Sequence, residues 1–493
     1  MAPTDPKTPA DLTVAPVMPP RSVSRKSVTQ ACTTSCSTAS TSLEAVSNLR
    51  APRYTSYPTA DRFTDLFSSI DYASHLRQRS SRDTSALSLY VHVPFCESLC
   101  YYCACNKVVT RKRHKGTRFL DALKREADLV LEQLGGQPVV RELHLGGGTP
   151  TWLTDQEIEQ LFSMLTERFA FQSGGEYSIE IDPRSVGDNT IEHLADLGFN
   201  RMSLGVQDID HRVQVAINRV QPLAMTENII ERARATGFRS TNVDLVYGLP
   251  YQTRDRFKKT IDAITDLRPE RIALFQYAHL PQSFKAQKRI DEKTLPSADE
   301  RRGIAMESRE RLEAAGYIHI GLDHFAVPED ELAKAAQTGR LHRNFQGYCT
   351  QANRNLVALG PSAISQVGSC YSQNERGFEA WRTRILKNEL PVARGIELTR
   401  DDHIRRNIIN ALMCNGYLDI ASVEIGWLID FKTYFATELE TLLHYQRIGI
   451  VTVTDEAIQL TAVGKENALR TVASAFDTAL RTLPRRACYS VVS

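Results

Sequence analysis

Short, nearly continuous apolar runs alternate with longer amphipathic stretches through the middle of the chain. The first run reads LSLYVHVPF, and the full set covers residues 87–95, 142–148, 177–182, 201–206, 241–248 and 271–278. Runs of this kind are typical of strands that are buried on both faces of a parallel sheet. Between them, apolar residues recur every three or four positions, which predicts helices over stretches such as residues 119–134 and 155–169.

Six strand–helix units in series predict an α/β fold in which a parallel sheet carries its helices on the outside. Six units are too few to close an eight-stranded barrel, so we expect a partial (β/α)6 barrel of the TIM-like kind. Gly198, Gly237 and Gly316 stand where helices should end. In such folds the functional residues gather at the C-terminal ends of the strands.

The character of the sequence changes three times, which suggests four regions. Residues 1–50 are rich in Ser, Thr and Pro and poor in large apolar residues, so we expect a disordered tail. Residues 51–86 form an N-terminal segment, and residues 87–375 hold the barrel units with an extension. Residues 376–493 read as helix, helix, β-hairpin and helix, which predicts a mostly helical, winged-helix-like domain.

Composition and charge favour a soluble protein of a reducing compartment. The 493 residues are 42% hydrophobic and 24% charged with a net charge of +2, so nothing demands a nucleic acid or a membrane surface. No apolar run approaches the about 18 residues of a membrane span. The Ser-rich start is weakly basic, but Asp5, Asp11 and many prolines argue against a transit peptide. We therefore expect a cytoplasmic protein.

The predicted winged-helix-like region raises the question of DNA binding, because such modules often bind DNA. No cluster of Lys and Arg stands out on its predicted recognition segment. We therefore expect this region to act as a docking or lid domain, and we expect no nucleic-acid partner.

Four cysteines fall within the stretch CESLCYYCAC, residues 96–105, directly after the first predicted strand. Their spacing fits neither the paired C-x2-C motifs of structural zinc nor a disulfide framework. Thiolates from one tight loop suit three corners of an iron–sulfur cube, which leaves the fourth iron open for a ligand. The C-x3-C-x2-C part of this stretch, which is Cys96, Cys100 and Cys103, meets that spatial need.

Glycine and polar residues occupy the other predicted strand ends. The second strand ends in a glycine run, and the third and fifth strands carry Glu180 and Asp244 near their ends. Glycines let the main chain approach a ligand closely, and carboxylates suit ribose hydroxyls or an ammonium group. From the residues alone, Glu180, Gln207 and Asp244 also fit helix caps or strand-end hydrogen bonds, Tyr90 fits the core, and a glycine run is a weak signal.

The cysteine spacing matches the signature of radical S-adenosylmethionine (SAM) proteins. From about residue 52 onward, the chain resembles the oxygen-independent coproporphyrinogen III oxidases. The stretches that carry this resemblance include PRYTSYPTA, YVHVPFCESLCYYCACNK, HLGGGTPT, IEIDPR, LGVQD, NVDLVYGLP, QYAHLP, GLDHFA, LHRNFQGY and SAIS. They follow one another in order over most of the chain. One departure is Ala104, where the family pattern has glycine.

The resemblance implies a six-unit partial barrel with a [4Fe–4S] cluster and two SAM molecules in one site. It implies that two propionates of coproporphyrinogen III become vinyl groups with loss of carbon dioxide, giving protoporphyrinogen IX through a deoxyadenosyl radical. A low-potential electron donor and an electron acceptor are further implied partners. We expect a monomer in which residues 51–86 lie at the substrate site.

The resemblance also assigns roles to single residues. Cys96, Cys100 and Cys103 hold the cluster. Positions around the cluster-bound SAM are Tyr90, Gly147, Glu180 and Ile364. Positions around the second SAM are Tyr102, Gly148, Thr149, Gln207, Arg219, Asp244 and Ala278. Candidates for the substrate pocket are Phe345, Gln346 and Cys105, together with Arg53, Arg184 and Arg343, because arginines suit the four propionates.

Two rival hypotheses remain from the sequence. One is a heme chaperone of the same superfamily that holds the cluster without decarboxylating a porphyrinogen. Cys105 and the start RYTSYPTA argue against it, because such chaperones usually lack both. The other is a zinc-bearing, winged-helix DNA-binding protein, against which the cysteine spacing argues.

Overall fold

The computed structural model describes residues 51–83, 85–345, 347–350 and 355–482, which fall into two compact units. The larger unit spans Thr55–Asp402. The smaller unit is made of the residues up to Tyr54 and those from His403 onward. The tail predicted to be disordered, residues 1–50, lies outside the described residues.

The larger unit is built on one sheet of 12 strands. Its central part is parallel, and the strands follow one another in chain order, which confirms the predicted α/β fold. These six strands are β1 (Leu87–Val93), β4 (Val139–Gly147), β5 (Ala170–Ile181), β6 (Arg201–Gln207), β7 (Ser240–Tyr247) and β8 (Arg271–Gln276).

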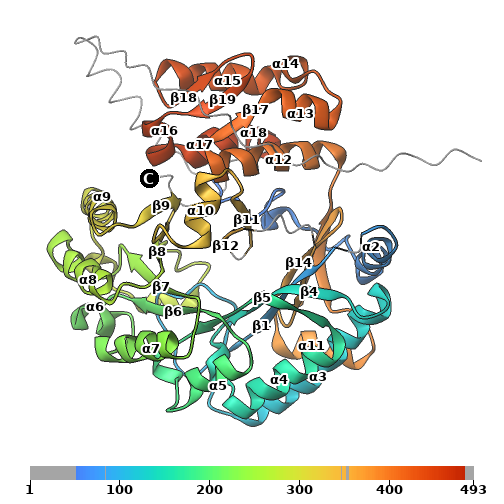
Figure 1. Ribbon diagram of the computed structural model, residues 1–493, viewed down its shortest axis with the longest axis vertical. Coiled ribbons are helices and arrows are strands. Elements are labelled where there is room, and N and C mark those ends of the chain that lie inside the picture. Colours follow the sequence, from blue (N-terminus) through green and yellow to red (C-terminus); the bar gives the residue numbers. More distant parts are fainter. Residues whose placement is uncertain (1–50, 84, 346, 351–354, 483–493) are drawn as a thin grey trace, which may run out of the picture. The chain divides into compact units, whose positions relative to one another are not determined.

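Helices connect the parallel strands along the outer face of the curved sheet (Figure 1). They are α3 (His114–Leu134), α4 (Asp155–Arg168), α5 (Thr190–Asp196), α7 (Leu223–Ala235) and α8 (Arg254–Leu267). A capping box between Thr154 and Glu157 begins α4. Gly198 and Gly237 follow helix ends with φ of +94° and +85°, values that glycine adopts without strain.

Further strands extend the sheet at both edges, which the sequence did not predict. On one side β13 (Leu356–Leu359) pairs in parallel with β1, so β1 is an inner strand. Antiparallel strands β14 (Ile364–Val367), β15 (Cys370–Asn374) and β16 (Val392–Glu397) continue that side. On the other side, β10 (His324–Ala326) pairs with β8 and β9 (Ile318–Gly321) with β10.

The larger unit therefore continues past the boundary expected at residue 375. Both β16 and α11 (Phe378–Leu386) belong to it, because β16 pairs with β15 along the sheet. A buried carboxylate ties this part to α3. Glu126 accepts hydrogen bonds from the amide of Gly360 at 2.8 Å, from Asn374 at 2.6 Å and from Trp381 at 3.1 Å.

The smaller unit contains the helices and the hairpin that suggest a winged-helix arrangement. Its main helices are α12 (Arg400–Asn415), which starts just inside the larger unit, α13 (Ile420–Trp427) and α15 (Ala436–Arg447). A sheet of β17 (Tyr417–Asp419), β19 (Ala457–Leu460) and β18 (Val451–Val453) packs with them. A buried ion pair of 2.8 Å joins Arg405 to Glu438. Across the described part of the chain, no helix combines the length and apolar character of a membrane span.

Candidate active site

The cysteine loop, residues 96–105, is held in place by the main chain on more than one side. It begins in β2 (Phe95–Cys96), which pairs in parallel with β3 (Val108–Val109) just after the loop. The amide of Tyr101 donates a hydrogen bond of 2.9 Å to the carbonyl of Ile217, from the segment that follows β6. The loop conformation therefore rests on bonds of the polypeptide itself.

The thiols of this loop differ in burial and in acidity. Cys96 and Cys100 are buried, and Cys103 is half-buried. Burial raises the pKa of Cys96 to about 11. A hydrogen bond from Thr149 Oγ1, 3.5 Å from the sulfur, opposes this rise but does not cancel it. A hydrogen bond with Cys105 lowers the pKa of Cys103 to about 6 and raises that of Cys105. The loop therefore offers one thiol that ionises near neutral pH, and the thiolate is the form that binds metal.

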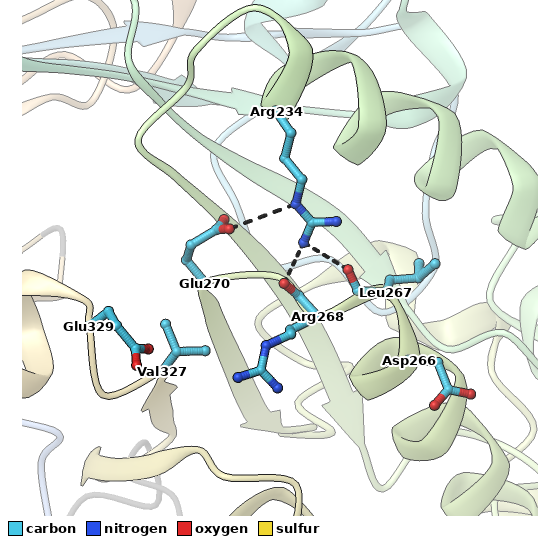
Figure 2. Close-up of a pocket in the computed structure, with 7 residues that line it drawn as sticks. All are labelled: Arg234, Asp266, Leu267, Arg268, Glu270, Val327 and Glu329. Carbon is cyan, nitrogen blue, oxygen red and sulfur yellow. Dashed lines mark hydrogen bonds and ion pairs between the residues drawn. The ribbon is translucent and has the colours of Figure 1, made fainter.

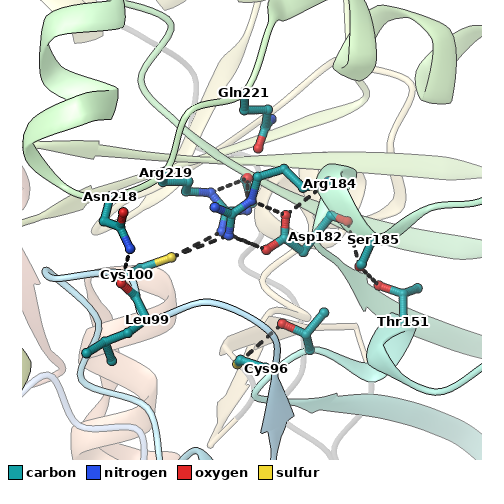
Figure 3. Close-up of polar contacts among 12 residues, drawn as sticks. Cys96, Leu99, Cys100, Thr151, Asp182, Arg184, Ser185, Asn218, Arg219 and Gln221 are labelled. Carbon is teal, nitrogen blue, oxygen red and sulfur yellow. Dashed lines mark hydrogen bonds and ion pairs between the residues drawn. The ribbon is translucent and has the colours of Figure 1, made fainter. Parts of the chain in front are cut away.

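Two arginines face the sulfur of Cys100 (Figure 3). Arg184 Nη2 lies 3.5 Å and Arg219 Nη1 lies 3.6 Å from Sγ of Cys100. Both guanidinium groups also bind Asp182, at 2.7 Å and 3.0 Å. Burial would raise the pKa of Asp182, but the two arginines lower it, so the carboxylate is ionised. This arrangement provides positive charge beside a candidate metal ligand.

A row of polar side chains crosses the inner face of β1, β4 and β5. Tyr90 is in register with His144, and His144 is in register with Ser178. The rings of Tyr90 and His144 stack with centroids 5.8 Å apart. His144 bonds Ser178 Oγ at 2.6 Å and lies 3.2 Å from Glu180 Oε1. Burial would raise the pKa of Glu180, but His144, the amide of Gly147 and His92 together lower it.

The glycine run after β4 brings the main chain close to its neighbours. Gly147 has a φ of +116°, and a Cβ atom there would lie 2.7 Å from the His92 ring. Its amide donates a hydrogen bond of 3.0 Å to Glu180. A Cβ atom on Gly148 would lie 2.7 Å from the carbonyl oxygen of Phe95, next to the cysteine loop. Side chains at these two positions would therefore force the turn away from the loop.

Polar residues on β6 and β7 form a second group. Asp244 accepts hydrogen bonds from Ser203 at 3.0 Å and from Asn242 at 2.7 Å. Burial and the charge of Glu180 raise the pKa of Asp244 to about 6. Gln207, at the end of β6, has a φ of +70°, a strained conformation for a residue with a side chain. Such strain is common where the main chain is shaped around a ligand.

Two positions assigned to the second SAM are joined by one side chain. Gln287 Nε2 donates hydrogen bonds to the carbonyls of Tyr102 and Ala278, at 3.0 Å and 3.2 Å. Tyr102 also packs against a buried apolar cluster that contains Tyr277. The cysteine loop and the end of β8 therefore meet in the structure, as the sequence predicts for strand ends of one barrel.

The remaining residues with a predicted role, Ile364 near the first SAM and the candidates for the substrate pocket, lie in different places. Phe345 and Ile364 both pack against one apolar cluster, and the ring of Phe345 meets that of Tyr371 edge-on at 5.6 Å. The guanidinium of Arg343 lies 4.6 Å from the ring centre of Tyr348. Arg53 belongs to the smaller unit. Gln346 lies outside the described residues.

Three residues of the site had no predicted role. Asp182 binds both arginines beside Cys100, and Lys107 Nζ donates to the carbonyls of Cys103 at 3.0 Å and Cys105 at 3.4 Å. His92 bonds the hydroxyl of Tyr90 at 3.0 Å and the carbonyl of Asn106 at 2.9 Å. Each is a charged or titratable residue at a strand end or beside the cysteines. Its position in the sequence could therefore have indicated that it belongs to the site.

The site fits an iron–sulfur cluster with a small polar ligand. Three thiols come from one loop, Arg184 and Arg219 can offset the charge of thiolates, and the glycines after β4 let the main chain approach a ligand. Within the described ranges, no three His, Cys, Asp or Glu side chains are gathered as ligands of a single metal ion.

A pocket of about 400 Å³ lies away from this site (Figure 2). It is found at the N-terminal end of β8, whereas the candidate site lies at the C-terminal strand ends. Its lining residues are Arg234, Asp266, Leu267, Arg268, Glu270, Val327 and Glu329. Arg234 donates a 2.8 Å hydrogen bond to the carbonyl of Leu267 at the end of α8, so its role there is to cap a helix.

Comparisons with known proteins agree with this geometry. The model of the radical SAM superfamily matches residues 90–264. The chain is 44% identical over 445 residues to the oxygen-independent coproporphyrinogen III oxidase of Escherichia coli (strain K12), covering 90% of this chain and 96% of the relative. It is 43% identical over 441 residues to the protein of the same name from Pseudomonas aeruginosa, covering 89% and 95%.

The fold has a counterpart among solved structures. A coproporphyrinogen III oxidase from Escherichia coli, described as a radical SAM enzyme, superimposes with a TM-score of 0.83 at 43% sequence identity. The superposition covers 86% of this chain and 97% of that one.

Proposed function

Because the chain belongs to the radical SAM superfamily and, within it, to the oxygen-independent coproporphyrinogen III oxidases, we propose that it acts on coproporphyrinogen III in heme biosynthesis. Two propionate side chains become vinyl groups, which gives protoporphyrinogen IX. Each propionate loses one hydrogen atom, one carbon dioxide molecule and one electron. The observation that carries this proposal is the three-cysteine loop in a chain that aligns with 96% of the Escherichia coli relative.

In this proposal Cys96, Cys100 and Cys103 hold a [4Fe–4S] cluster. When bound, the cluster and SAM supply a deoxyadenosyl radical that removes the hydrogen atom from a propionate β-carbon. The residues of the chain bind and orient SAM and the substrate, and they exclude water from the site. Arg184 and Arg219 hold positive charge beside Cys100 at 3.5 Å and 3.6 Å, where it would offset the negative charge of a thiolate-bound cluster.

We propose that the first SAM lies among Tyr90, Gly147, Glu180 and Ile364. The amide of Gly147 donates a hydrogen bond of 3.0 Å to the ionised carboxylate of Glu180. This supports a role of both residues in positioning the charged amino-acid part of SAM. The apolar cluster that Ile364 shares with Phe345 offers a surface for an adenine ring.

We propose that a second SAM lies among Tyr102, Gly148, Thr149, Gln207, Arg219, Asp244 and Ala278. Asp244 already accepts two hydrogen bonds, and its carboxylate retains capacity for a ribose hydroxyl. The strained conformation of Gln207 supports the same role. Equilibrium dialysis with labelled SAM tests the stoichiometry, and one SAM per chain would contradict it.

The substrate contacts, the location and the oligomeric state are also proposals. Arg343 is buried, so a propionate at its guanidinium would make a strong, dehydrated ion pair. Cys105, an exposed residue at the end of the cysteine loop, is proposed to line the substrate pocket. The free thiols at all seven described cysteines support a reducing compartment such as the cytoplasm. We propose that the chain acts as a monomer.

The activity is tested by anaerobic reconstitution with iron and sulfide. The protein is incubated with coproporphyrinogen III, SAM and dithionite, and the products are oxidised and separated as porphyrins. We expect protoporphyrin from the wild type and none from Cys103→Ser, which lacks one ligand. Cleavage of SAM without any protoporphyrin would instead support the heme-chaperone hypothesis.

A further inference from the structure

A run of basic residues follows the cysteine loop along the chain. Between Glu97 and Asp121 there is no acidic residue, whereas Lys or Arg occurs at Lys107, Arg111, Lys112, Arg113, Lys115 and Arg118. The whole chain has a net charge of only +2, so this is a local concentration of positive charge. Such a run is often only a solvated surface, and its place in the fold decides whether it is more than that.

The basic run begins beside the first candidate ligand. The register of β2 and β3 sets Val109 opposite Cys96. The amide of the next residue, Thr110, donates a hydrogen bond of 2.9 Å to the carbonyl of Cys96. Arg111 follows directly. One hydrogen bond and one peptide unit therefore separate Arg111 from the main chain of Cys96, a predicted cluster ligand.

Only part of the run is neutralised. Arg113 pairs with Glu157 and Arg118 pairs with Glu379, each over 3.0 Å. For Arg111, Lys112 and Lys115, the described part of the chain provides no ion-pair partner. Arg111 and Lys112 are exposed, and Lys115 is half-exposed. We refer to these three residues as the basic surface.

The basic surface lies where a helix disfavours positive charge. α3 begins at His114, and its first turn contains no acidic residue. A helix N-terminus carries the positive end of the helix dipole, and acidic residues are the stabilising choice there. By contrast, α4 begins with Asp155 and Glu157. The cations at the start of α3 therefore oppose local helix stability, and together with the dipole they create a positive potential at this surface.

We propose that the basic surface docks a small acidic carrier protein that delivers one electron at a time. This inference rests on the proposed function, in which each cleavage of SAM takes one electron from outside, and so two electrons are taken for each coproporphyrinogen III. The carrier loses one electron and the cluster held by the cysteine loop gains it, and no bond or proton changes place. A nucleic acid would also be attracted by Arg111, Lys112 and Lys115, but the direct hydrogen-bonded link to Cys96 favours a redox partner.

The test compares two variants of the reconstituted full-length protein. The first is Arg111→Gln/Lys112→Gln/Lys115→Gln, which removes the basic surface. The control is Lys258→Gln/Lys259→Gln/Lys334→Gln, which removes the same charge from two other helices, α8 and α10 (Glu331–Gln337). Binding of an oxidised flavodoxin and of an oxidised plant-type ferredoxin is measured by fluorescence anisotropy at low and high salt. This readout does not depend on turnover.

We expect the first variant to bind at least one carrier about tenfold more weakly at low salt, with the difference shrinking at high salt. The control should bind as the wild type does. If flavodoxin is the carrier whose binding weakens, the partner uses flavin chemistry. If ferredoxin is that carrier, the partner uses iron–sulfur chemistry. Equal affinity of the two variants for both carriers would overturn the proposal. Tighter binding of a short duplex DNA or RNA than of either carrier, lost in the first variant, would overturn it in favour of a nucleic acid.

Activity with dithionite separates this proposal from the proposed function. A small reductant needs no docking surface, so both variants should form protoporphyrin at the wild-type rate with dithionite. With a reduced carrier, only the first variant should slow, by about tenfold in kcat/KM. If the wild type forms no product with dithionite, the proposed function fails, while the binding measurement still decides whether the surface docks an acidic carrier.

Discussion

Arg184 Nη2 lies 3.5 Å from Sγ of Cys100, and the same guanidinium is bound to Asp182 over 2.7 Å. The sequence suggested Arg184 as a partner for a substrate propionate. In the structure its charge is directed to a predicted cluster ligand. Hydrogen bonds and positive charge near the sulfurs raise the reduction potential of an iron–sulfur cluster, because they stabilise the extra electron of the reduced state.

Replacing Arg184 with Met should therefore make the cluster harder to reduce. Losing one charge-assisted hydrogen bond of roughly 1.4 kcal/mol corresponds to about 60 mV for a one-electron couple. The midpoint potential is measured by a redox titration followed by EPR. Arg184→Lys keeps the charge and should recover part of the shift. An unchanged midpoint in the Met variant, at wild-type iron content, would show that the contact does not tune the cluster.

The cysteines of the loop should separate by their effect on iron content. Cys103→Ser should lose the cluster after anaerobic reconstitution, because three thiolates are needed to hold it. Cys105→Ser should keep about four iron atoms per chain, because Cys105 stands outside the ligand set. Iron and acid-labile sulfide are assayed chemically. Loss of iron in Cys105→Ser with retention in Cys103→Ser would reverse the assignment.

Gly147→Ala should weaken SAM binding and reduce stability. The φ of +116° disfavours a side chain, and the new Cβ atom would lie 2.7 Å from the His92 ring. A cost of roughly 1–3 kcal/mol in the free energy of unfolding follows. Gly136→Ala is the matched control, since its φ is +64° and no atom lies within 4 Å of the new Cβ. Urea unfolding measures the loss of stability in the two variants, and calorimetry measures their binding of SAM. Equal effects of Gly147→Ala and Gly136→Ala would refute the close approach at Gly147.

Glu126 should make stability depend on pH. Burial raises its pKa from the usual value of 4.5 to about 8, although Gly360, Trp381 and Asn374 donate to it. Between these two values the folded state binds more protons than the unfolded state, so the free energy of unfolding should fall as the pH rises from about 4.5 to about 8. Urea unfolding across this range measures the slope. Glu126→Gln, which cannot titrate, should flatten it.

Truncation of the same residue tests its structural role. Glu126→Ala leaves three buried donors without an acceptor and should cost roughly 3 kcal/mol or more. Asp121→Ala, on an exposed position of the same helix, should change the free energy of unfolding by less than about 0.5 kcal/mol. Similar losses in the two variants would mean that the contacts of Glu126 contribute little.

The sequence was sufficient for the six parallel strands and their order, because each strand is a distinct apolar run followed by a helix of period 3.6. It was not sufficient for β9, β10 and β13–β16. These strands have three to six residues, and short runs of that kind cannot be told from loops by periodicity. Their pairing also depends on contacts distant in the sequence, such as that between β13 and β1.

Within the site, the sequence suggested single residues but not their hydrogen-bond partners. The cysteine spacing predicts three cluster ligands, but nothing in the sequence indicated that Arg184 lies beside Cys100. Glu126 carried a signal that went unused. It lies three and four residues from Leu123 and Val130, on the buried face of α3, where a carboxylate requires donors. The partners that provide them lie more than 200 residues further along the chain.

All three predicted ligands lie on one short loop whose ends and middle are fastened to the protein. The amide of Val108 bonds the carbonyl of Pro94 at 2.7 Å, and Asn218 bonds the carbonyl of Leu99 at 2.8 Å. Among the described residues, these three cysteines connect no two strands of the 12-stranded sheet. We therefore expect a cluster held by this loop to be inserted, and replaced after damage by oxygen, without refolding of the chain.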